Sequence, residues 1–255
     1  MSDERTILVT GAGGGMGREI ARLCLARGVR VAAADLSLAA LRETMGDAQD
    51  SALLLAGDLT SDGAPEATVA AVVDRWGRID ALVNNAGYGA IEPFLEMRRS
   101  TWQRTLDINT VALAMLTAAA GRFMRDAGRG RIVNVTSPAS RMALPHYTAY
   151  AASKAAVDAI TRSAAVALAP YGVQVNSIAP GMMDTEMQRS TEADIARIEG
   201  RTDMQQFLAE RTARIPLGRR AEVREIAESV VWLALDAPDY MTAERLNMSG
   251  GMDKD

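Results

Sequence analysis

The chain has 255 residues, of which 48% are hydrophobic and 24% are charged, and its formal net charge is -4. This length and apolar content allow one α/β domain with a large core. A protein that binds a phosphate backbone needs a concentrated basic face, which the acidic balance disfavours. We therefore expect no nucleic-acid partner.

The opening segment, MSDERTILVTG, is charged and then strand-like, and no apolar run reaches about 18 residues without charge. We therefore expect no membrane association and a cytoplasmic location. Cys24 is the single cysteine and lies in an apolar helical pattern, so we expect it to be buried. No group of metal-ligand residues is evident, and no metal is expected.

The first motif is TILVTGAGGGMGREIARLCLARG, an apolar strand followed by a glycine-rich turn and a run with helical period. The spacing G-x-G-x-x-G fails because Met16 stands at its last glycine. T-G-x-x-x-G-x-G fits Thr10, Gly11, Gly15 and Gly17. Such glycines let the backbone approach a pyrophosphate, and the N–H groups of the following helix face the anion. The motif predicts nucleotide binding.

A second apolar run, VRVAAAD, ends in Asp35, eighteen residues after Gly17. An acid at this place can accept hydrogen bonds from both ribose hydroxyls of an adenosine, and it repels a 2′-phosphate. This favours NAD over NADP. The structural alternative is that Asp35 caps the next helix, a role for which Ser37 competes.

Further strand-like runs, ALLLAGDLT, GRIDALVNNAG, RIVNVTS and GVQVNSIAP, each stop in small or polar residues. Open parallel sheets bind ligands at the carboxyl ends of their strands. We therefore expect these ends to line a binding crevice.

Ser137, Tyr150 and Lys154 have the spacing of an acid/base site. Tyr150 and Lys154 are four residues apart, so they share one face of a helix. Bringing a tyrosine pKa from about 10 to near 7 needs about 4 kcal/mol of phenolate stabilisation, much of which a neighbouring ammonium can supply. A serine hydroxyl can donate to a developing alkoxide. Taken alone, Tyr150 and Lys154 could also be a surface pair.

With these motifs in order, the chain resembles the short-chain dehydrogenase/reductase family over nearly its whole length. The resemblance implies a single-domain α/β fold over 1–255, a Rossmann-like doubly wound parallel sheet of about seven strands flanked by helices. It also implies a catalytic tetrad of Asn109, Ser137, Tyr150 and Lys154. The implied cofactor-binding residues are Gly11, Gly14, Gly15, Met16, Gly17, Asp35, Leu36, Asp58, Leu59, Asn85, Ala86, Gly87, Tyr150, Lys154, Pro180, Gly181 and Thr185.

Several roles rest on the resemblance alone. Asn109 matches the helix asparagine that holds a water between the lysine and solvent, and Asp58 matches the acid that contacts adenine. Members that prefer NADP often carry a basic residue where this chain has Gly14, which again favours NAD. The family also has Thr-Gly and an acidic residue where this chain has Thr242-Ala243 and Ser249, so subunit contacts can differ.

Two alanine-rich helices, expected at 103–127 and 148–169, are apolar on more than one face. A helix that touches only one sheet needs a single apolar stripe, so we expect a homotetramer built on these helices, as in similar family members. The alternative is a thicker monomeric core.

The polar, charged segment 188–214 resembles the family's mobile substrate lid. Arg141 and His146 lie in the loop before Tyr150 and are candidate substrate contacts. Inward-facing lid cations such as Arg189, Arg197 and Arg201 would indicate an anionic substrate, whereas solvated ones favour a neutral polyol. We expect the second arrangement.

The leading prediction is an NAD-dependent oxidoreductase that interconverts a secondary alcohol and a ketone, with a soft likeness to polyol dehydrogenases such as those for sorbitol. A 3-oxoacyl reductase is the second enzymatic hypothesis, which Asp35 disfavours because biosynthetic reduction generally draws on NADPH. A nucleotide-sensing regulator without catalysis is the third, although such a protein has no need of Tyr150.

Overall fold

The computed structural model describes residues 5–48 and 50–253. Within these residues, seven strands form one parallel sheet in the order β3-β2-β1-β4-β5-β6-β7. The strands are β1 (Thr6–Thr10), β2 (Arg30–Asp35), β3 (Ala52–Ala56), β4 (Ala81–Asn84), β5 (Gly130–Val135), β6 (Val173–Pro180) and β7 (Arg245–Met248). The predicted single-domain, doubly wound parallel sheet is confirmed.

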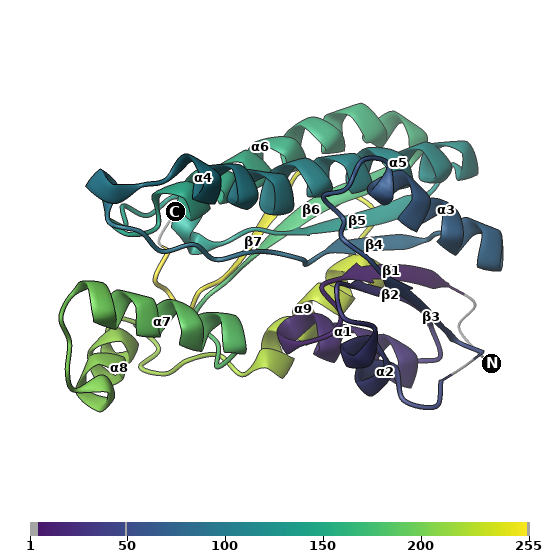
Figure 1. The fold of residues 1–255 in the computed structure, drawn as a ribbon. Coiled ribbons are helices and arrows are strands. Elements are labelled where there is room, and N and C mark those ends of the chain that lie inside the picture. The colour runs from purple at the N-terminus through teal and green to yellow at the C-terminus, as the bar shows by residue number, and fades with distance from the viewer. Residues whose placement is uncertain (1–4, 49, 254–255) are drawn as a thin grey trace.

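Helices cover both faces of the sheet (Figure 1). One layer holds α1 (Gly15–Ala26), α2 (Leu38–Met45) and α9 (Val223–Leu235), and the other holds α3 (Ala64–Trp76), α4 (Arg99–Leu106), α5 (Leu113–Ala127) and α6 (Thr148–Leu168). Beyond the sheet stand α7 (Glu186–Ile198) and α8 (Met204–Ala213). Short turns of helix lie at η1 (Phe94–Glu96), η3 (Pro138–Ser140) and η4 (Ala169–Tyr171).

The central strands are buried on both faces, which explains their continuous apolar runs. Every residue of β1 is buried, and its side chains divide between two apolar cores, with Ile7 in one and Leu8 in the other. The chain leaves β3 at the sheet edge and returns to pair β4 with β1. This reversal of strand order opens a crevice at the carboxyl ends of β1 and β4, where ligands bind in such sheets.

The helix predicted over 103–127 is interrupted. The structure has α4, then a π-helical segment η2 (Asp107–Ala112), then α5. A π turn inserts one extra residue per turn and occurs frequently at functional sites. The helix predicted over 148–169 is confirmed as α6, which ends one residue earlier. Cys24 is fully buried, as predicted.

Ala243 has a φ of 64°, in the left-handed region that favours glycine. This is the position at which the resemblance leads one to expect glycine, so the alanine adopts the backbone of the residue it replaces. Across the described parts of the chain, none of the helices combines the length and apolar character that crossing a bilayer requires.

Candidate functional site

The glycine-rich turn between β1 and α1 brings backbone segments into close approach. A Cβ on Gly17 would lie 2.1 Å from the Gly11 carbonyl oxygen and 2.5 Å from Nδ2 of Asn85. Gly11 itself has a φ of 64°. A Cβ on Gly14, by contrast, would meet no atom within 4 Å. The turn is therefore closed on its inner side at Gly17 and open toward the crevice at Gly14.

Thr10 and Asn85 join the ends of β1 and β4. The Thr10 hydroxyl accepts hydrogen bonds from the backbone N–H groups of Asn85 and Ala86, each at 3.0 Å. The Asn85 side chain donates to the carbonyls of Thr10 at 2.9 Å and Gly11 at 3.2 Å. These bonds fix the glycine-rich turn against the Asn85–Gly87 segment.

We expect Gly17→Ala to lose roughly 2 kcal/mol or more of unfolding free energy and to weaken NADH binding, since its Cβ has no room beside Gly11. Gly14→Ala is the matched control, with space for the Cβ and an extended φ of -160°; its stability should stay within about 0.5 kcal/mol of wild type. Thermal unfolding and NADH fluorescence measure both properties. Equal effects of the two variants would contradict this account of the turn.

Asp35, at the end of β2, holds the turn from the other side. Its Oδ2 accepts a hydrogen bond from the Gly13 N–H at 2.9 Å, and its Oδ1 accepts from the Ser37 N–H at 3.1 Å. The Ser37 hydroxyl caps α2 by accepting from the Ala40 N–H. Ser37, and not Asp35, is therefore the N-cap.

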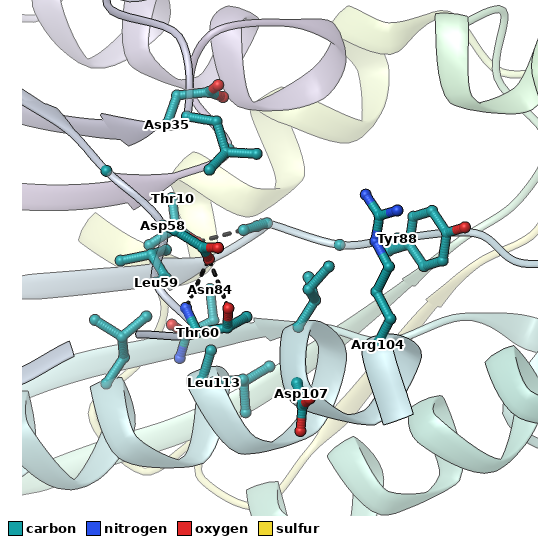
Figure 2. Close-up of a pocket in the computed structure, with 18 of the residues that line it drawn as sticks. Thr10, Asp35, Asp58, Leu59, Thr60, Asn84, Tyr88, Arg104, Asp107 and Leu113 are labelled. Atoms are coloured by element: carbon teal, nitrogen blue, oxygen red, sulfur yellow. Dashed lines mark hydrogen bonds between the residues drawn. The ribbon is translucent and has the colours of Figure 1, made fainter. Parts of the chain in front are cut away.

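A first cavity of about 720 Å³ lies between the strand ends and the start of α5. Figure 2 shows Asp35 and Asp58, from neighbouring strand ends, along this space. The Asp58 carboxylate accepts hydrogen bonds from the N–H and the hydroxyl of Thr60, which lower the pKa of Asp58. Arg104 stacks on the Tyr88 ring at 4.5 Å on the opposite side.

A second cavity, of about 670 Å³, shares Gly11, Asp35, Ala86 and Gly87 with the first. It extends from the glycine-rich turn to the proposed catalytic side chains and the start of α7. The predicted site residues that line it are Gly11, Gly14, Gly15, Met16, Asp35, Asn85, Ala86, Gly87, Ser137, Tyr150, Lys154, Pro180, Gly181 and Thr185. The two cavities thus form one groove along the carboxyl edge of the sheet.

Ser137 and Tyr150 meet in this second cavity. Burial raises the pKa of the Tyr150 phenol, and a hydrogen bond with the Ser137 side chain opposes the rise. The structure therefore differs from the expectation that the Tyr150 pKa is lowered in this arrangement, because loss of solvation outweighs the favourable contacts.

Lys154 lies one turn further along α6, with its Nζ 5.7 Å from the Tyr150 ring centroid. The ammonium donates a hydrogen bond to the Val135 carbonyl at 2.8 Å. Burial lowers the pKa of Lys154 to about 8, while the nearby Asp158 carboxylate acts in the opposite direction. The side chain is therefore mostly charged at neutral pH and can release a proton in mildly alkaline solution.

Asn109 is fully buried in the π-helical segment and does not line either cavity. Its side-chain amide accepts from the Tyr88 N–H at 2.7 Å and donates to the Tyr88 carbonyl and the Ser153 hydroxyl, each at 2.9 Å. A Cβ on Gly87 would lie 3.5 Å from Asn109 Oδ1 and 3.8 Å from Lys154 Nζ. Asn109 thus adjoins the lysine across Gly87 without a direct bond to it.

Arg245 on β7 is a further positioning group, which no sequence motif indicates. Its guanidinium donates to the Ser137 carbonyl at 3.1 Å and pairs with Asp253 at 2.7 Å and Asp158 at 3.4 Å. The Ser249 hydroxyl accepts from the Asp253 N–H at 3.1 Å. The end of the described chain therefore holds the Ser137 loop in place.

The two residues suggested as substrate contacts lie away from the cavity lining. Arg141 is exposed, and His146 Nε2 lies 3.7 Å from a carboxylate oxygen of Glu199 at the end of α7. Neither side chain lines either cavity. Both belong to the loop before α6, but that loop turns Met142, Leu144 and Tyr147 to the cavity instead. Direct substrate contact by Arg141 and His146 stays a prediction that this placement does not favour.

Arg189, Arg197 and Arg201 are paired with acids in or directly before the lid segment 188–214. Arg189 pairs with Asp184, Arg197 with Asp194 and Arg201 with Glu210. None of the three lines the cavity, whereas Arg211 and Arg214 do. The sequence offered no signal for this difference, because helix phase and packing decide which lid cation faces inward.

The groove fits a dinucleotide on structural grounds. Gly17 leaves no room for a Cβ, whereas the space beside Gly14 is open, and the Asp35 carboxylate lies beside the turn. The helix N-terminus of α1 follows at once, which suits a pyrophosphate. The same groove continues to Ser137, Tyr150 and Lys154.

The family model described as enoyl-(acyl carrier protein) reductase matches residues 11–253. The chain belongs to the short-chain dehydrogenase/reductase family. Its relatives include sorbitol dehydrogenase of Cereibacter sphaeroides, 35% identical over 98% of this chain and 97% of that one.

Two solved structures of family members bind different cofactors. The chain is 32% identical to actinorhodin polyketide ketoreductase with NADPH, with a TM-score of 0.94 and full coverage of both chains. It is 33% identical to NAD⁺-bound xylitol dehydrogenase, with a TM-score of 0.90 and coverage of 97% and 98%. This short-chain dehydrogenase/reductase is therefore an oxidoreductase that acts on alcohols or ketones.

Proposed function

We propose that this enzyme oxidises a small secondary alcohol to a ketone, reversibly, with NAD as its cofactor. The observation that carries the proposal is that Ser137, Tyr150 and Lys154 share one cavity with the glycine-rich turn, which Asp35 adjoins. A bound nicotinamide supplies the hydride acceptor for the oxidation.

Tyr150, Ser137 and Lys154 have different roles in this proposal. Tyr150 takes the proton from the substrate hydroxyl, and Ser137 donates a hydrogen bond to the substrate oxygen. Burial works against ionisation of the phenol, so the charged Lys154 must supply the opposing field. Lys154 also binds the nicotinamide ribose in this proposal.

The choice of NAD is supported by Asp35 and Gly14. The Asp35 carboxylate adjoins the turn where an adenosine ribose is expected, and it repels a 2′-phosphate. Gly14 offers no positive partner, although the space beside it is open. A reductase that prefers NADPH, such as the ketoreductase relative, is the alternative.

We expect the wild-type enzyme to prefer NAD over NADP by at least about tenfold in kcat/KM, which corresponds to about 1.4 kcal/mol. Asp35→Ser combined with Gly14→Arg should move the ratio toward NADP by about a hundredfold, because repulsion is replaced by a charge-assisted contact. Gly14→Ala controls for loss of the glycine alone. Equal use of both cofactors by wild type would place Asp35 away from the ribose.

The activity itself is tested by following absorbance of the reduced nicotinamide with a panel of polyols and other secondary alcohols. Oxidation with NAD supports the proposal. Reduction of 3-oxoacyl thioesters by NADPH without alcohol oxidation would favour the ketoreductase alternative. Tight NADH binding with no turnover of either class would favour a nucleotide sensor.

We also propose a homotetramer that uses α5 and α6, which lie side by side (Figure 1). Large apolar side chains are exposed on these helices and on the adjoining π-helical segment, namely Val111, Met115, Phe123 and Val166. An exposed apolar strip of this kind is typical of a subunit interface. The cytoplasmic location stays a prediction from the sequence.

A further inference from the structure

A buried ion cluster joins the two lid helices to the loop that follows them. Glu192 on α7 is 2% exposed. The Arg220 guanidinium donates two hydrogen bonds to the Glu192 carboxylate, of 3.0 Å and 2.8 Å. Arg211 on α8 reaches the same carboxylate only through Nε, at 3.1 Å. One carboxylate thus faces two guanidinium groups, and the cluster carries a net positive charge.

Arg211 is the member of this cluster that presents positive charge to the second cavity. Its Nη2 donates to the Tyr147 hydroxyl at a long 3.3 Å and lies 3.8 Å from the Met182 sulfur, both weak acceptors. Its Nη1 has no hydrogen-bond partner among residues 5–48 and 50–253. Arg211 and Tyr147 line the second cavity, whereas Glu192 and Arg220 do not.

Arg211 is connected to the proposed reaction centre through Tyr147. The ring centroids of Tyr147 and Tyr150 are 6.2 Å apart. Arg211 bonds to the Tyr147 hydroxyl, and Arg211, Tyr147 and Tyr150 all line the second cavity. The same cavity is also lined by the apolar side chains of Met142, Leu144 and Met182. Apolar surroundings lower the local dielectric, which strengthens a charge-assisted hydrogen bond.

Besides Asp35 and Lys154, two other charged groups line the second cavity with Arg211. Arg214 is exposed and adds to the positive charge, while Glu186, at the start of α7, is exposed and opposes it. Within residues 5–48 and 50–253, neither side chain makes a hydrogen bond or an ion pair that fixes its position. Of the two arginines that line the cavity, Arg211 is the one whose orientation is fixed, because Glu192, Tyr147 and the Phe207 ring at 5.6 Å all contact it.

We propose that Arg211 binds a carboxylate on the substrate, so that the enzyme prefers small hydroxy acids and their keto acids to neutral polyols. This proposal rests on the proposed function and names its substrate class. A planar guanidinium can engage a carboxylate through two N–H groups. Within the described residues, Nη1 of Arg211 is free for this contact, and Nη2 has only its two weak acceptors to exchange for a carboxylate oxygen. A neutral hydroxyl at the same place would leave the net charge of the cluster unbalanced.

Binding without reaction tests the subsite directly. Cyclohexanecarboxylate and cyclohexanecarboxamide have no hydroxyl to oxidise, and calorimetry on the NADH-saturated full chain measures their affinities. The acid should bind at least about tenfold more tightly than the amide, the advantage of one charge-assisted hydrogen bond. Arg211→Gln should abolish this preference, and Arg211→Lys should restore part of it. Equal affinities in wild type would overturn the proposal.

Arg197→Gln is the matched control, since it removes one lid cation that pairs with Asp194 away from the cavity. It should keep the full preference for the acid. A loss equal to that in Arg211→Gln would assign the effect to overall charge and overturn the local site. Arg211→Gln should still fold because Arg220 keeps both bonds to Glu192, and thermal unfolding verifies this.

D-gluconate and D-sorbitol form a second matched pair, which differ only in a carboxylate against a hydroxymethyl group. With NAD, Arg211→Gln should raise KM for gluconate at least about tenfold and change that for sorbitol by less than about twofold. Preferential binding of the acid without oxidation of any alcohol would refute the proposed function and leave the subsite standing. Oxidation of both compounds with no preference would refute the subsite alone.

Discussion

Tyr150→Phe should lower turnover by at least about a hundredfold while the fold and NADH affinity are retained. The substitution removes only the hydroxyl that would take the substrate proton, and the ring keeps its edge contact with Tyr147. The hydroxyl forms a hydrogen bond with the Ser137 side chain, and loss of one such bond costs about 1 kcal/mol of unfolding free energy. Steady-state kinetics, NADH fluorescence titration and thermal unfolding measure the three properties.

Tyr171→Phe is the control for this experiment. This variant also removes a tyrosine hydroxyl, but from an exposed residue in η4, which follows α6. It should leave turnover unchanged. Near-normal turnover of Tyr150→Phe would show that the proton has another acceptor, and Tyr150 would then lose its acid/base role.

Lys154→Met should lose both turnover, by at least about a hundredfold, and NADH affinity. Methionine keeps an apolar chain of similar length but provides neither the positive field at Tyr150 nor the donor that now meets the Val135 carbonyl. Parallel measurements of kcat and of the NADH dissociation constant test the two roles separately. Retention of either property would remove the corresponding role from Lys154.

The same variant has a distinct effect on stability. Burial lowers the pKa of Lys154 from 10.5 to about 8, so between these values the unfolded chain binds more protons than the folded one. Stability from this group therefore rises with pH across that window, by up to roughly 3 kcal/mol. Wild type should gain unfolding free energy relative to Lys154→Met from pH 8 to 10. Denaturant titrations measure the unfolding free energy of both proteins at each pH. The same pH dependence in wild type and Lys154→Met would contradict a lowered pKa of Lys154 in the folded protein.

The sequence alone determined the outline of this protein. Strand-length apolar runs that end in small or polar residues predict a parallel sheet with a crevice at its carboxyl edge, and the structure has that sheet. The glycine-rich turn was equally predictable, because a position with no room for a Cβ, such as Gly17, requires glycine and is therefore visible in the sequence. These features depend on local backbone geometry, which neighbouring residues largely set.

Other features depend on distant segments and were not predictable. The break in the helix at Asn109 follows from the match between its amide and the Tyr88 backbone, twenty-one residues away. Arg245 reaches the Ser137 carbonyl across 108 positions of sequence. No pattern of period 2 or 3.6 records such a pairing, since each side chain would be an ordinary residue of its own element.

The orientation of the lid cations is the clearest case. Arg189, Arg197, Arg201 and Arg211 all stand in one polar segment, and their composition and spacing favour solvent for all of them. Arg197 and Arg201 do pair with acids of that segment, and Arg189 pairs with Asp184 just before it. Arg211 instead bonds to the buried Glu192 and lines the cavity. The sequence thus determined the fold and the groove through local periodicity and backbone geometry. Only the tertiary structure decided which of these charges lines the cavity, because that depends on how two helices pack around one buried carboxylate.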